Sequence, residues 1–260
     1  MKPLLFCLSV ALAIGALFAK TPDTSQATSA RVPILVELFT SEGCSSCPPA
    51  DRFLERLDQQ PTSGAEFIVL SEHVDYWNHI GWKDPYSSHV YSERQDAYAN
   101  RFGLDSVYTP QMIVDGSTEF TGSDTTQAQK AFSQAVTSPK IPVHLSLISG
   151  DSFQIHVHVT ADPLSPAIPA REAEAYAVLA LNHAESHVSA GENGGRTLTH
   201  VAVVRSLISV GKLTHDNGFD QNVPLKLRPG DDPRNVRVIV FVQQAGQGRV
   251  LGAAEQSIVH

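Results

Sequence analysis

The sequence predicts an α/β domain followed by an all-β, sandwich-like domain, behind an N-terminal export signal. Three observations indicate this fold class. A Cys-x-x-Cys pair lies between an apolar strand and an amphipathic helix, a Thr-Pro pair precedes a hairpin, and the later half has the hydrophobic period of strands. We place the signal peptide and its tether at residues 1–30, the α/β domain at 31–138 and the β-sandwich-like domain at 139–260.

The composition indicates a globular chain with a large core. Of its 260 residues, 42% are hydrophobic and 18% are charged, and the formal net charge is −8. Nucleic-acid binding requires a basic surface, so this charge argues against a nucleic-acid partner. No motif indicates a nucleotide, a flavin or a haem, and we predict no cofactor.

An export signal is predicted at the N-terminus. Lys2 supplies a basic start, residues 4–18 form an apolar run, and Ala19 offers a small residue for cleavage. The run is shorter than the ~20 apolar residues of a membrane span, so we expect no stable membrane span once the signal is removed. A tether rich in Ser, Thr and Ala follows at 21–30. These features predict a periplasmic or secreted protein.

A β-α-β unit is predicted around the cysteine pair. Residues 32–39 form a nearly continuous apolar run, as expected of a strand buried on both faces. Pro48 and Pro49 fit the first turn of a helix. Its apolar stripe consists of Ala50, Phe53, Leu54 and Leu57. The next strand, at 67–70, is expected to run parallel to the first because a helical crossover joins them.

Cys44 and Cys47 remain as the only cysteines once the signal, which holds Cys7, is removed. An exported chain meets an oxidising compartment, so we expect the two to form a disulfide. A ring this small constrains the unfolded chain least, which favours a reactive disulfide over a structural one. A helix N-terminus also suits reactivity, because the helix dipole stabilises the thiolate that attacks disulfides. A structural disulfide is the alternative.

The segment at 72–103 carries both tryptophans of the chain. Its second half has helical spacing and ends at Gly103, a favourable residue for the end of a helix. Its first half offers polar and aromatic side chains for the rim of a groove beside the cysteines, with Trp77 as a substrate-binding residue. This set consists of His73, Asp75, Trp77, His79 and Trp82. The alternative is that the aromatic residues only pack an inserted loop onto the sheet.

Thr109 and Pro110 come directly before a predicted hairpin. Strands at 112–114 and 118–121 flank an Asp-Gly turn, which is typical of hairpins. A helix follows, with Asp124 as its N-terminal cap.

The later half of the chain predicts about seven strands and no strong helix, which favours an antiparallel sandwich. The predicted strands are at 143–149, 153–160, 174–182, 200–210, 225–227, 236–243 and 250–254. Several histidines lie in this half, but no three or four have the spacing of a metal site, and we predict no metal there. These histidines are His156, His158, His183, His187 and His200. The Gly-rich segment at 191–197 is interpreted as a hairpin connection that carries Arg196 toward the domain interface.

Four stretches together carry a resemblance to a known family. They are VELFTSEGCSSCPPAD, HVDYWNHIGWKDP, YTPQMIVDG and GENGGRTLTHVAVVR. Residues 31 to about 138 resemble the thioredoxin fold, and nearly the whole mature chain resembles an uncharacterised secreted family of thioredoxin-like proteins, a domain of unknown function. The resemblance implies an α/β thioredoxin-like domain followed by an all-β sandwich-like domain.

The resemblance also implies roles for five residues. Cys44 is the attacking thiolate, as the more exposed cysteine, and Cys47 resolves the mixed disulfide. Glu37 relays protons to Cys47 from the preceding strand, or alternatively it points to solvent at a strand edge. Thr109 and Pro110, with a cis peptide bond opposite the dithiol, bind an extended substrate.

The sequence therefore predicts an exported thiol–disulfide oxidoreductase that acts on protein or small-molecule thiols and disulfides. Two alternatives remain open. The two cysteines and a histidine, His73 or His79, suit Cu(I), which would make this a copper-handling protein. An inert disulfide would make it a non-enzymatic binding module that contacts a partner protein through its β domain.

Overall fold

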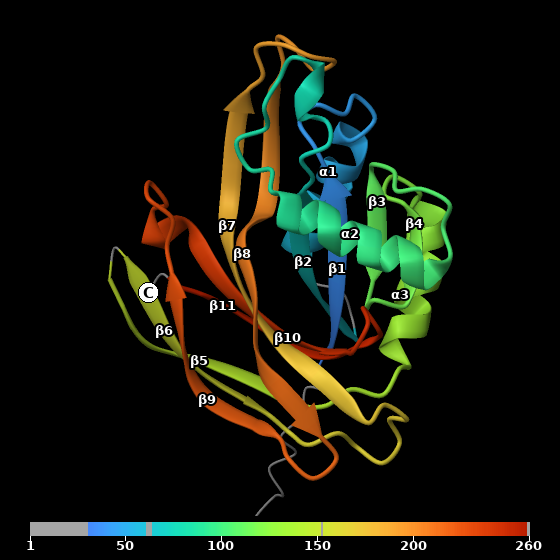
Figure 1. Ribbon diagram of the computed structural model, residues 1–260, viewed down its shortest axis with the longest axis vertical. Coiled ribbons are helices and arrows are strands. Elements are labelled where there is room, and N and C mark those ends of the chain that lie inside the picture. The colour runs from blue at the N-terminus through green and yellow to red at the C-terminus, as the bar shows by residue number, and fades with distance from the viewer. Residues whose placement is uncertain (1–30, 61–63, 152, 259–260) are drawn as a thin grey trace, which may run out of the picture.

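The computed structural model describes residues 31–60, 64–151 and 153–258 (Figure 1). The predicted signal peptide and tether at 1–30 lie outside the described residues. The first half contains β1 (Val32–Thr40), α1 (Pro48–Gln59), β2 (Ala65–His73), the short 3-10 helix η1 (Asn78–Ile80), α2 (His89–Phe102), β3 (Gln111–Val114), β4 (Thr118–Thr121) and α3 (Thr125–Val136). The second half contains β5 (Val143–Gly150), β6 (Gln154–Ala161), β7 (Glu172–His187), β8 (Thr197–Thr214), β9 (Phe219–Lys226), η2 (Pro233–Asn235), β10 (Val236–Gln244) and β11 (Val250–Ser257).

The strands form one large mixed sheet and one small sheet. The large sheet has eight strands in the order β11-β10-β7-β8-β2-β1-β3-β4, and the small one has the order β5-β6-β9. β1 and β2 are parallel, as predicted from the helical crossover between them. The two halves of the chain join where β8 runs parallel to β2 through the pair Ser71 and Val203.

The predicted fold class, an α/β thioredoxin-like domain followed by a separate all-β sandwich-like domain, is wrong. The described residues form a mainly β protein with three α-helices, and one sheet runs through both halves. All seven strands predicted for the later half exist, but β7, β8, β10 and β11 extend the sheet of the first half. A strand pattern shows which face is buried and not which partner a strand pairs with, so the sequence did not reveal this continuity. The boundary between residues 138 and 139 stays a prediction.

The large sheet is covered on both faces. Successive residues of a strand point to opposite faces, so Leu38 packs into the core that α1 and α3 share, whereas Phe39 packs against Tyr98 of α2. In Figure 1, α2 crosses in front of the strands and α1 lies behind them. β7 and β10 also alternate: Val178 faces the core of the first half, while Leu179 faces the small sheet.

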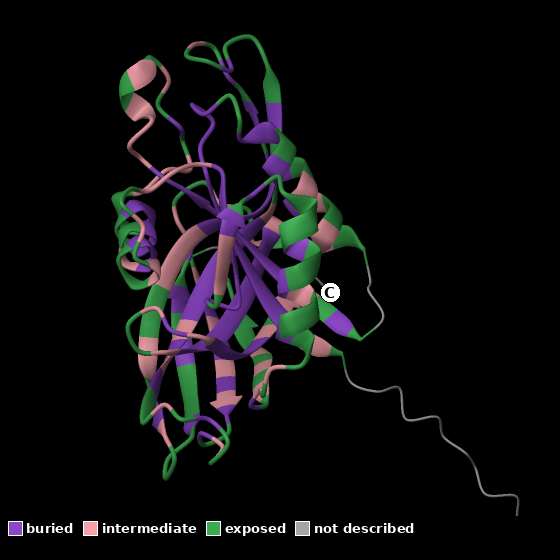
Figure 2. Ribbon diagram, turned by 90° about the vertical axis from the view of Figure 1, so that its right-hand side faces the viewer, coloured by how far each residue is buried: buried purple, intermediate pink, exposed green. Residues whose placement is uncertain are grey.

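Burial follows this layering. Figure 2 shows the central strands as continuous buried runs, whereas the outward faces of the helices are exposed. Among the described residues, no helix is long and apolar enough to cross a membrane.

Candidate disulfide site at the start of helix α1

The predicted disulfide is present between Cys44 and Cys47, whose Cα atoms lie 5.4 Å apart. Cys47 is the N-cap residue of α1, and Pro48 opens the helix as predicted. Both cysteines are 0% exposed, so the expectation that Cys44 is the more exposed one is wrong. The two serines between them, Ser45 and Ser46, are the exposed part of this loop.

Few backbone donors remain free around the sulfur atoms. Pro48 and Pro49 have no N–H, and the next two N–H groups, of Ala50 and Asp51, both donate to the Cys47 carbonyl at 2.9 and 3.1 Å. A hydroxyl supplies a polar contact instead, since Ser46 Oγ lies 3.3 Å from the Sγ of Cys44. The helix dipole and this hydroxyl are thus the features that favour a thiolate here.

Thr109, Pro110 and Trp77 all lie at this loop, and their role in binding a substrate stays a prediction. Ser46 Oγ donates to the Thr109 carbonyl at 3.4 Å, and Trp77 Nε1 donates to Thr109 Oγ1 at 2.8 Å. The Thr109–Pro110 peptide bond is cis.

Two glycines show how close these elements lie. A Cβ atom on Gly122 would lie 3.1 Å from Ala50 Cβ and 3.2 Å from Pro110 Cβ, so Pro110 packs next to the first turn of α1. A Cβ atom on Gly43 would lie 3.0 Å from Trp77 Cβ, which places Trp77 against the residue before the disulfide.

Glu37 is buried, which rules out the alternative of an acid that points to solvent. Its carboxylate accepts hydrogen bonds from Arg94 Nε at 2.7 Å and from the Tyr98 hydroxyl at 2.6 Å, both on α2. Strand alternation explains this direction, because Glu37 lies on the α2 face of β1 while Leu38 lies on the α1 face. The structure thus pairs Glu37 with α2, and its predicted proton relay to Cys47 has no supporting contact.

A second acid shares Arg94 with Glu37. Glu72 Oε1 lies 3.6 Å from Arg94 Nε. Burial raises the pKa of Glu72 well above its ordinary value, and the neighbouring Glu37 adds to this effect although Arg94 opposes it. Arg94 is thus the cation that the two buried acids share.

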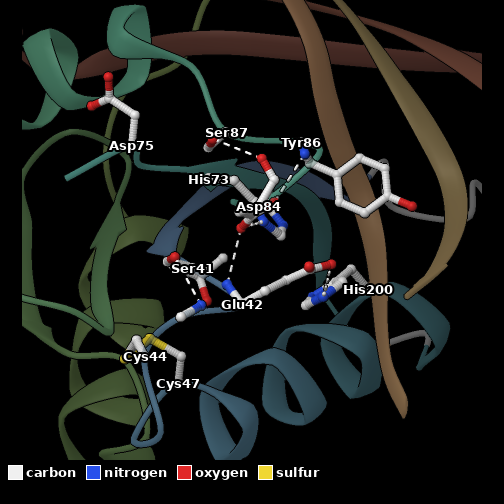
Figure 3. Close-up of polar contacts among 12 residues, drawn as sticks. Ser41, Glu42, Cys44, Cys47, His73, Asp75, Asp84, Tyr86, Ser87 and His200 are labelled. Atoms are coloured by element: carbon white, nitrogen blue, oxygen red, sulfur yellow. Dashed lines mark hydrogen bonds and ion pairs between the residues drawn. A yellow bond between two sulfur atoms is a disulfide. The ribbon is translucent and has the colours of Figure 1, made fainter. Parts of the chain in front are cut away.

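A buried cluster of charged groups lies beside the disulfide loop (Figure 3). His200, from β8, is placed between two carboxylates, with Nε2 3.6 Å from Glu42 Oε1 and Nδ1 3.7 Å from Asp51 Oδ1. These distances are those of ion pairs and exceed hydrogen-bond length. Burial by itself would lower the pKa of His200, but Asp51 and Glu42 outweigh burial and raise it to about 10. His200 is therefore an imidazolium at neutral pH.

Further hydrogen bonds fix the two carboxylates. Trp82 Nε1 donates to Glu42 Oε2 at 2.7 Å, and Thr40 Oγ1 donates to Asp51 Oδ1 at 2.9 Å. Asp51 lies four residues after Cys47 on α1, so the two side chains share one face of the helix start. Glu42 and Asp51 thus bracket the disulfide in sequence and meet at His200 in space.

The predicted groove-rim residues separate in the structure. His73 Nδ1 is 2.7 Å from Asp84 Oδ2, and its ring lies 4.6 Å from that of His200, so it belongs to the buried cluster. Asp75 accepts from Ser92 of α2, and His79 is on the surface with Nδ1 2.7 Å from the Tyr76 carbonyl. In the described part of the chain, no group of three or more His, Cys, Asp and Glu residues is placed to hold a metal ion.

The loop between β7 and β8 is hydrogen-bonded to the disulfide loop. Asn193 is fully buried, and its Nδ2 donates to the carbonyls of Glu42 and Cys44 at 2.9 and 3.0 Å. Glu192 Oε2 accepts from the Ser45 N–H at 3.1 Å. In Figure 1, this loop and the segment with η1 lie together at the top of the molecule, near the start of α1. The Gly-rich segment therefore does connect a hairpin, as predicted, and it reaches the disulfide.

Sequence reasoning missed Glu42, Asp51, His200 and Asn193 as parts of the site. Asp51 lies outside the apolar stripe of its predicted helix, and His200 belongs to a set of histidines without the spacing of a metal site, so neither pattern predicts a role at the disulfide. The sequence did contain a signal for two of them, because Asn193 and His200 both lie in GENGGRTLTHVAVVR, one of the four stretches that carry the family resemblance.

Fold and site together define a mainly β protein with a buried Cys-x-x-Cys disulfide at a helix N-terminus. The chain belongs to the family described as "Protein of unknown function (DUF1223)", whose model matches residues 35–243. The prediction of a domain of unknown function is thereby confirmed. No curated protein matches the chain.

Two solved structures are similar over most of this chain. The X-ray structure of protein AGR_C_4864 from Agrobacterium tumefaciens is 26% identical with a TM-score of 0.69, and the match covers 89% of this chain and 96% of that one. HBP35 of Porphyromonas gingivalis is 14% identical with a TM-score of 0.60, and the match covers 88% of this chain and 76% of that one. At 14% identity, the similarity to HBP35 is a similarity of fold only.

Proposed function

We propose that this protein is an exported thiol–disulfide oxidoreductase, periplasmic or secreted, in which Cys44 and Cys47 exchange with thiols and disulfides of a partner. The observation that carries the proposal is the disulfide itself, which ends in the N-cap residue of α1. At this position the helix dipole favours the thiolate, the form that reacts. The export part of the proposal depends on the apolar run at residues 4–18.

The reaction is a pair of exchanges at sulfur. When the protein acts as the oxidant, a partner thiolate attacks one sulfur of the disulfide, the Cys44–Cys47 bond breaks, and a mixed disulfide forms. A second partner thiolate then displaces the protein sulfur. The partner loses two electrons and two protons and becomes a disulfide, and the protein takes them up as two thiols. When the protein acts as the reductant, the same steps run in reverse.

Neighbouring groups support such a site. In this proposal Cys44 forms the mixed disulfide, Cys47 resolves it, and Thr109, Pro110 and Trp77 border the partner. The Ser46 hydroxyl lies 3.3 Å from Cys44 Sγ and would stabilise a Cys44 thiolate by turning its O–H from the Thr109 carbonyl to the sulfur. The thioredoxin-like relationship belongs to the same proposal, and the contacts of Thr109 with Ser46 and Trp77 support it.

Burial of both cysteines supports a second candidate, a binding module with a structural disulfide. A disulfide without exposed surface resists attack, because a thiolate must approach one sulfur in line with the S–S bond. The two candidates differ in the reduction potential, since structural disulfides typically lie below about −300 mV.

The deciding experiment measures this potential by equilibrating the mature protein in glutathione and dithiothreitol buffers and counting free thiols. We expect a potential above about −300 mV. Cys47→Ser should trap a mixed disulfide with a partner, whereas Cys44→Ser should abolish exchange. A potential below that value, or unchanged exchange in Cys44→Ser, would refute the oxidoreductase.

A further inference from the structure

The loop between β7 and β8 makes three hydrogen bonds to the disulfide loop, from residues 147 to 151 positions later in the chain. Two come from Asn193 Nδ2, to the carbonyls of Glu42 and Cys44, and the third joins the Ser45 N–H to Glu192 Oε2. These bonds engage the backbone on both sides of the Cys44 side chain. The position of Cys44 is therefore coupled to the position of this loop.

Asn193 is held in place by its own loop. Arg196 Nη1 donates to Asn193 Oδ1 at 3.0 Å, which orients the amide so that Nδ2 points to the two carbonyls. The Arg196 N–H also donates to the Asn193 carbonyl, and the loop closes where the Gly195 N–H donates to the Val188 carbonyl. Asn193 is fully buried although the residues on either side of it are exposed. A buried polar side chain at the tip of an exposed loop indicates a specific contact.

The same loop packs closely against the segment that contains η1. A Cβ atom on Gly191 would lie 3.4 Å from Trp82 Cβ and 3.5 Å from the Ile80 carbonyl oxygen. The backbone at Gly191 has φ = 75°, a conformation that glycine adopts without strain. The loop between β7 and β8 thus contacts both the disulfide loop and the segment that contains η1.

We propose that Glu192 and Asn193 form a cover that controls access to the Cys44–Cys47 disulfide and must move before any thiol can react with it. The inference rests on the proposed function, because a cover matters only if the disulfide reacts. It accounts for the combination of a disulfide at a helix start and cysteines without exposed surface. Asn193 is the positioning residue in this proposal, since it binds the carbonyl of Cys44 itself.

The size of the effect follows from the bonds that are lost. Each hydrogen bond contributes a modest free energy, and loss of the two from Asn193 should raise the open fraction by roughly 5- to 150-fold. A small reductant that reacts only with the open state should show the same increase in rate, provided that opening and closing are fast.

The test is reduction of the oxidised mature protein by tris(2-carboxyethyl)phosphine, followed by counting free thiols. The phosphine takes oxygen from water and becomes its oxide, while the disulfide gains two electrons and two protons. We expect Asn193→Ala to be reduced roughly 5 to 150 times faster than the wild type, and Glu192→Gln to be faster by a smaller factor. Asn222→Ala is the matched control, because it also removes an asparagine side chain. Asn222 lies on β9, and its hydrogen-bond partner is His158 of β6 and not the disulfide loop. This control should keep the wild-type rate.

Three results would overturn the cover. In the first, the wild type is reduced as fast as a short peptide with the same Cys-Ser-Ser-Cys disulfide. In the second, neither loop variant is reduced faster than the wild type. In the third, Asn193→Ala is reduced only at the rate at which that variant unfolds globally. Glu192 is exposed, so Glu192→Gln keeps the test valid if Asn193→Ala folds poorly. The phosphine needs neither a partner nor a particular potential. Faster reduction of Asn193→Ala together with a potential typical of structural disulfides would keep the cover and refute the oxidoreductase.

Discussion

At the scale of single residues, His200 is the cation between two buried carboxylates beside the disulfide. Glu42, Asp51 and His200 are each less than a tenth exposed, so little water screens their interactions. Two carboxylates this deeply buried are stable together only with a cation between them. His200 provides that cation, and its proton is therefore linked to folding.

We predict that stability falls as the pH rises from about 6.5 to about 10, because the pKa of His200 is raised to about 10 in the folded protein. The folded state binds this proton more tightly than the unfolded chain does. The stabilisation that this proton gives is complete below pH 6.5, the ordinary pKa of histidine. It disappears as the pH rises through the pKa that His200 has in the folded protein. The full effect amounts to at most about 5 kcal/mol, since one pKa unit corresponds to about 1.4 kcal/mol.

The measurement is the free energy of unfolding from urea titrations at several pH values, for the wild type and for His200→Gln. The difference between the two proteins isolates His200 from other groups that titrate in this range. We expect the wild type to lose its advantage over the variant toward pH 10. Parallel curves for both proteins would contradict the prediction.

At the scale of elements, the site depends on how closely α1 approaches the turn after β4. Gly122 lies where a Cβ atom would meet Leu38 Cδ1 at 2.8 Å, Ala50 Cβ at 3.1 Å and Pro110 Cβ at 3.2 Å. The missing side chain lets the first turn of α1 pack directly against Pro110. The Gly122 N–H also donates to the Pro110 carbonyl at 2.9 Å, which fixes the proline from the same residue.

We predict that Gly122→Ala destabilises the protein by about 1–3 kcal/mol, the usual cost of overpacking a core. The variant should also increase the distance between α1 and Pro110. Urea unfolding measures the first effect. Gly150→Ala is the control, because its nearest neighbour would be an ordinary 3.6 Å contact with Ile155. Equal stability of the two variants would show that α1 and Pro110 tolerate the added methyl group.

At the scale of the whole molecule, Arg94 connects the two halves of the chain. It binds Glu37 of β1, donates to Gln243 of β10 at 3.1 Å and donates to Gln247 beyond β10 at 3.0 Å. Its guanidinium also lies 5.4 Å from the ring centroid of Phe241. The side chain of Arg94 thus connects β1 and β10, two strands of the large sheet that lie far apart in the sequence.

We predict that Arg94→Met costs about 3–5 kcal/mol, because it leaves Glu37 and Glu72 buried without their cation. Addition of Glu37→Gln to this variant should restore part of the loss, since it removes one of the stranded charges. Arg234→Met is the control, because Arg234 is an exposed partner of Asp232, and we expect it to change stability by less than about 0.5 kcal/mol. Chemical denaturation compares the four proteins. If Arg94→Met lowered the free energy of unfolding only slightly, the contacts of Arg94 would not be what holds the two halves together.

The sequence by itself determined the local features of this protein. Apolar runs located β1, β2 and the strands of the later half, and the Cys-x-x-Cys pair followed by two prolines located the start of α1. These features follow from interactions between residues close in sequence, which a pattern records directly. The resemblance to the thioredoxin fold, and not a local pattern, led to the expectation that Thr109 and Pro110 lie opposite Cys44 and Cys47.

Only the tertiary structure decided which strands share a sheet and which side chains meet. Pairing between β2 and β8, the Arg94 partner of Glu37, and the contacts of Asn193 and His200 with the disulfide loop join residues far apart in the chain. The physical reason is that hydrophobic periodicity reports burial and not partners. The disulfide was predictable from sequence, but the hydrogen bonds that tie its loop to Glu192 and Asn193 of the other half are a property of the fold.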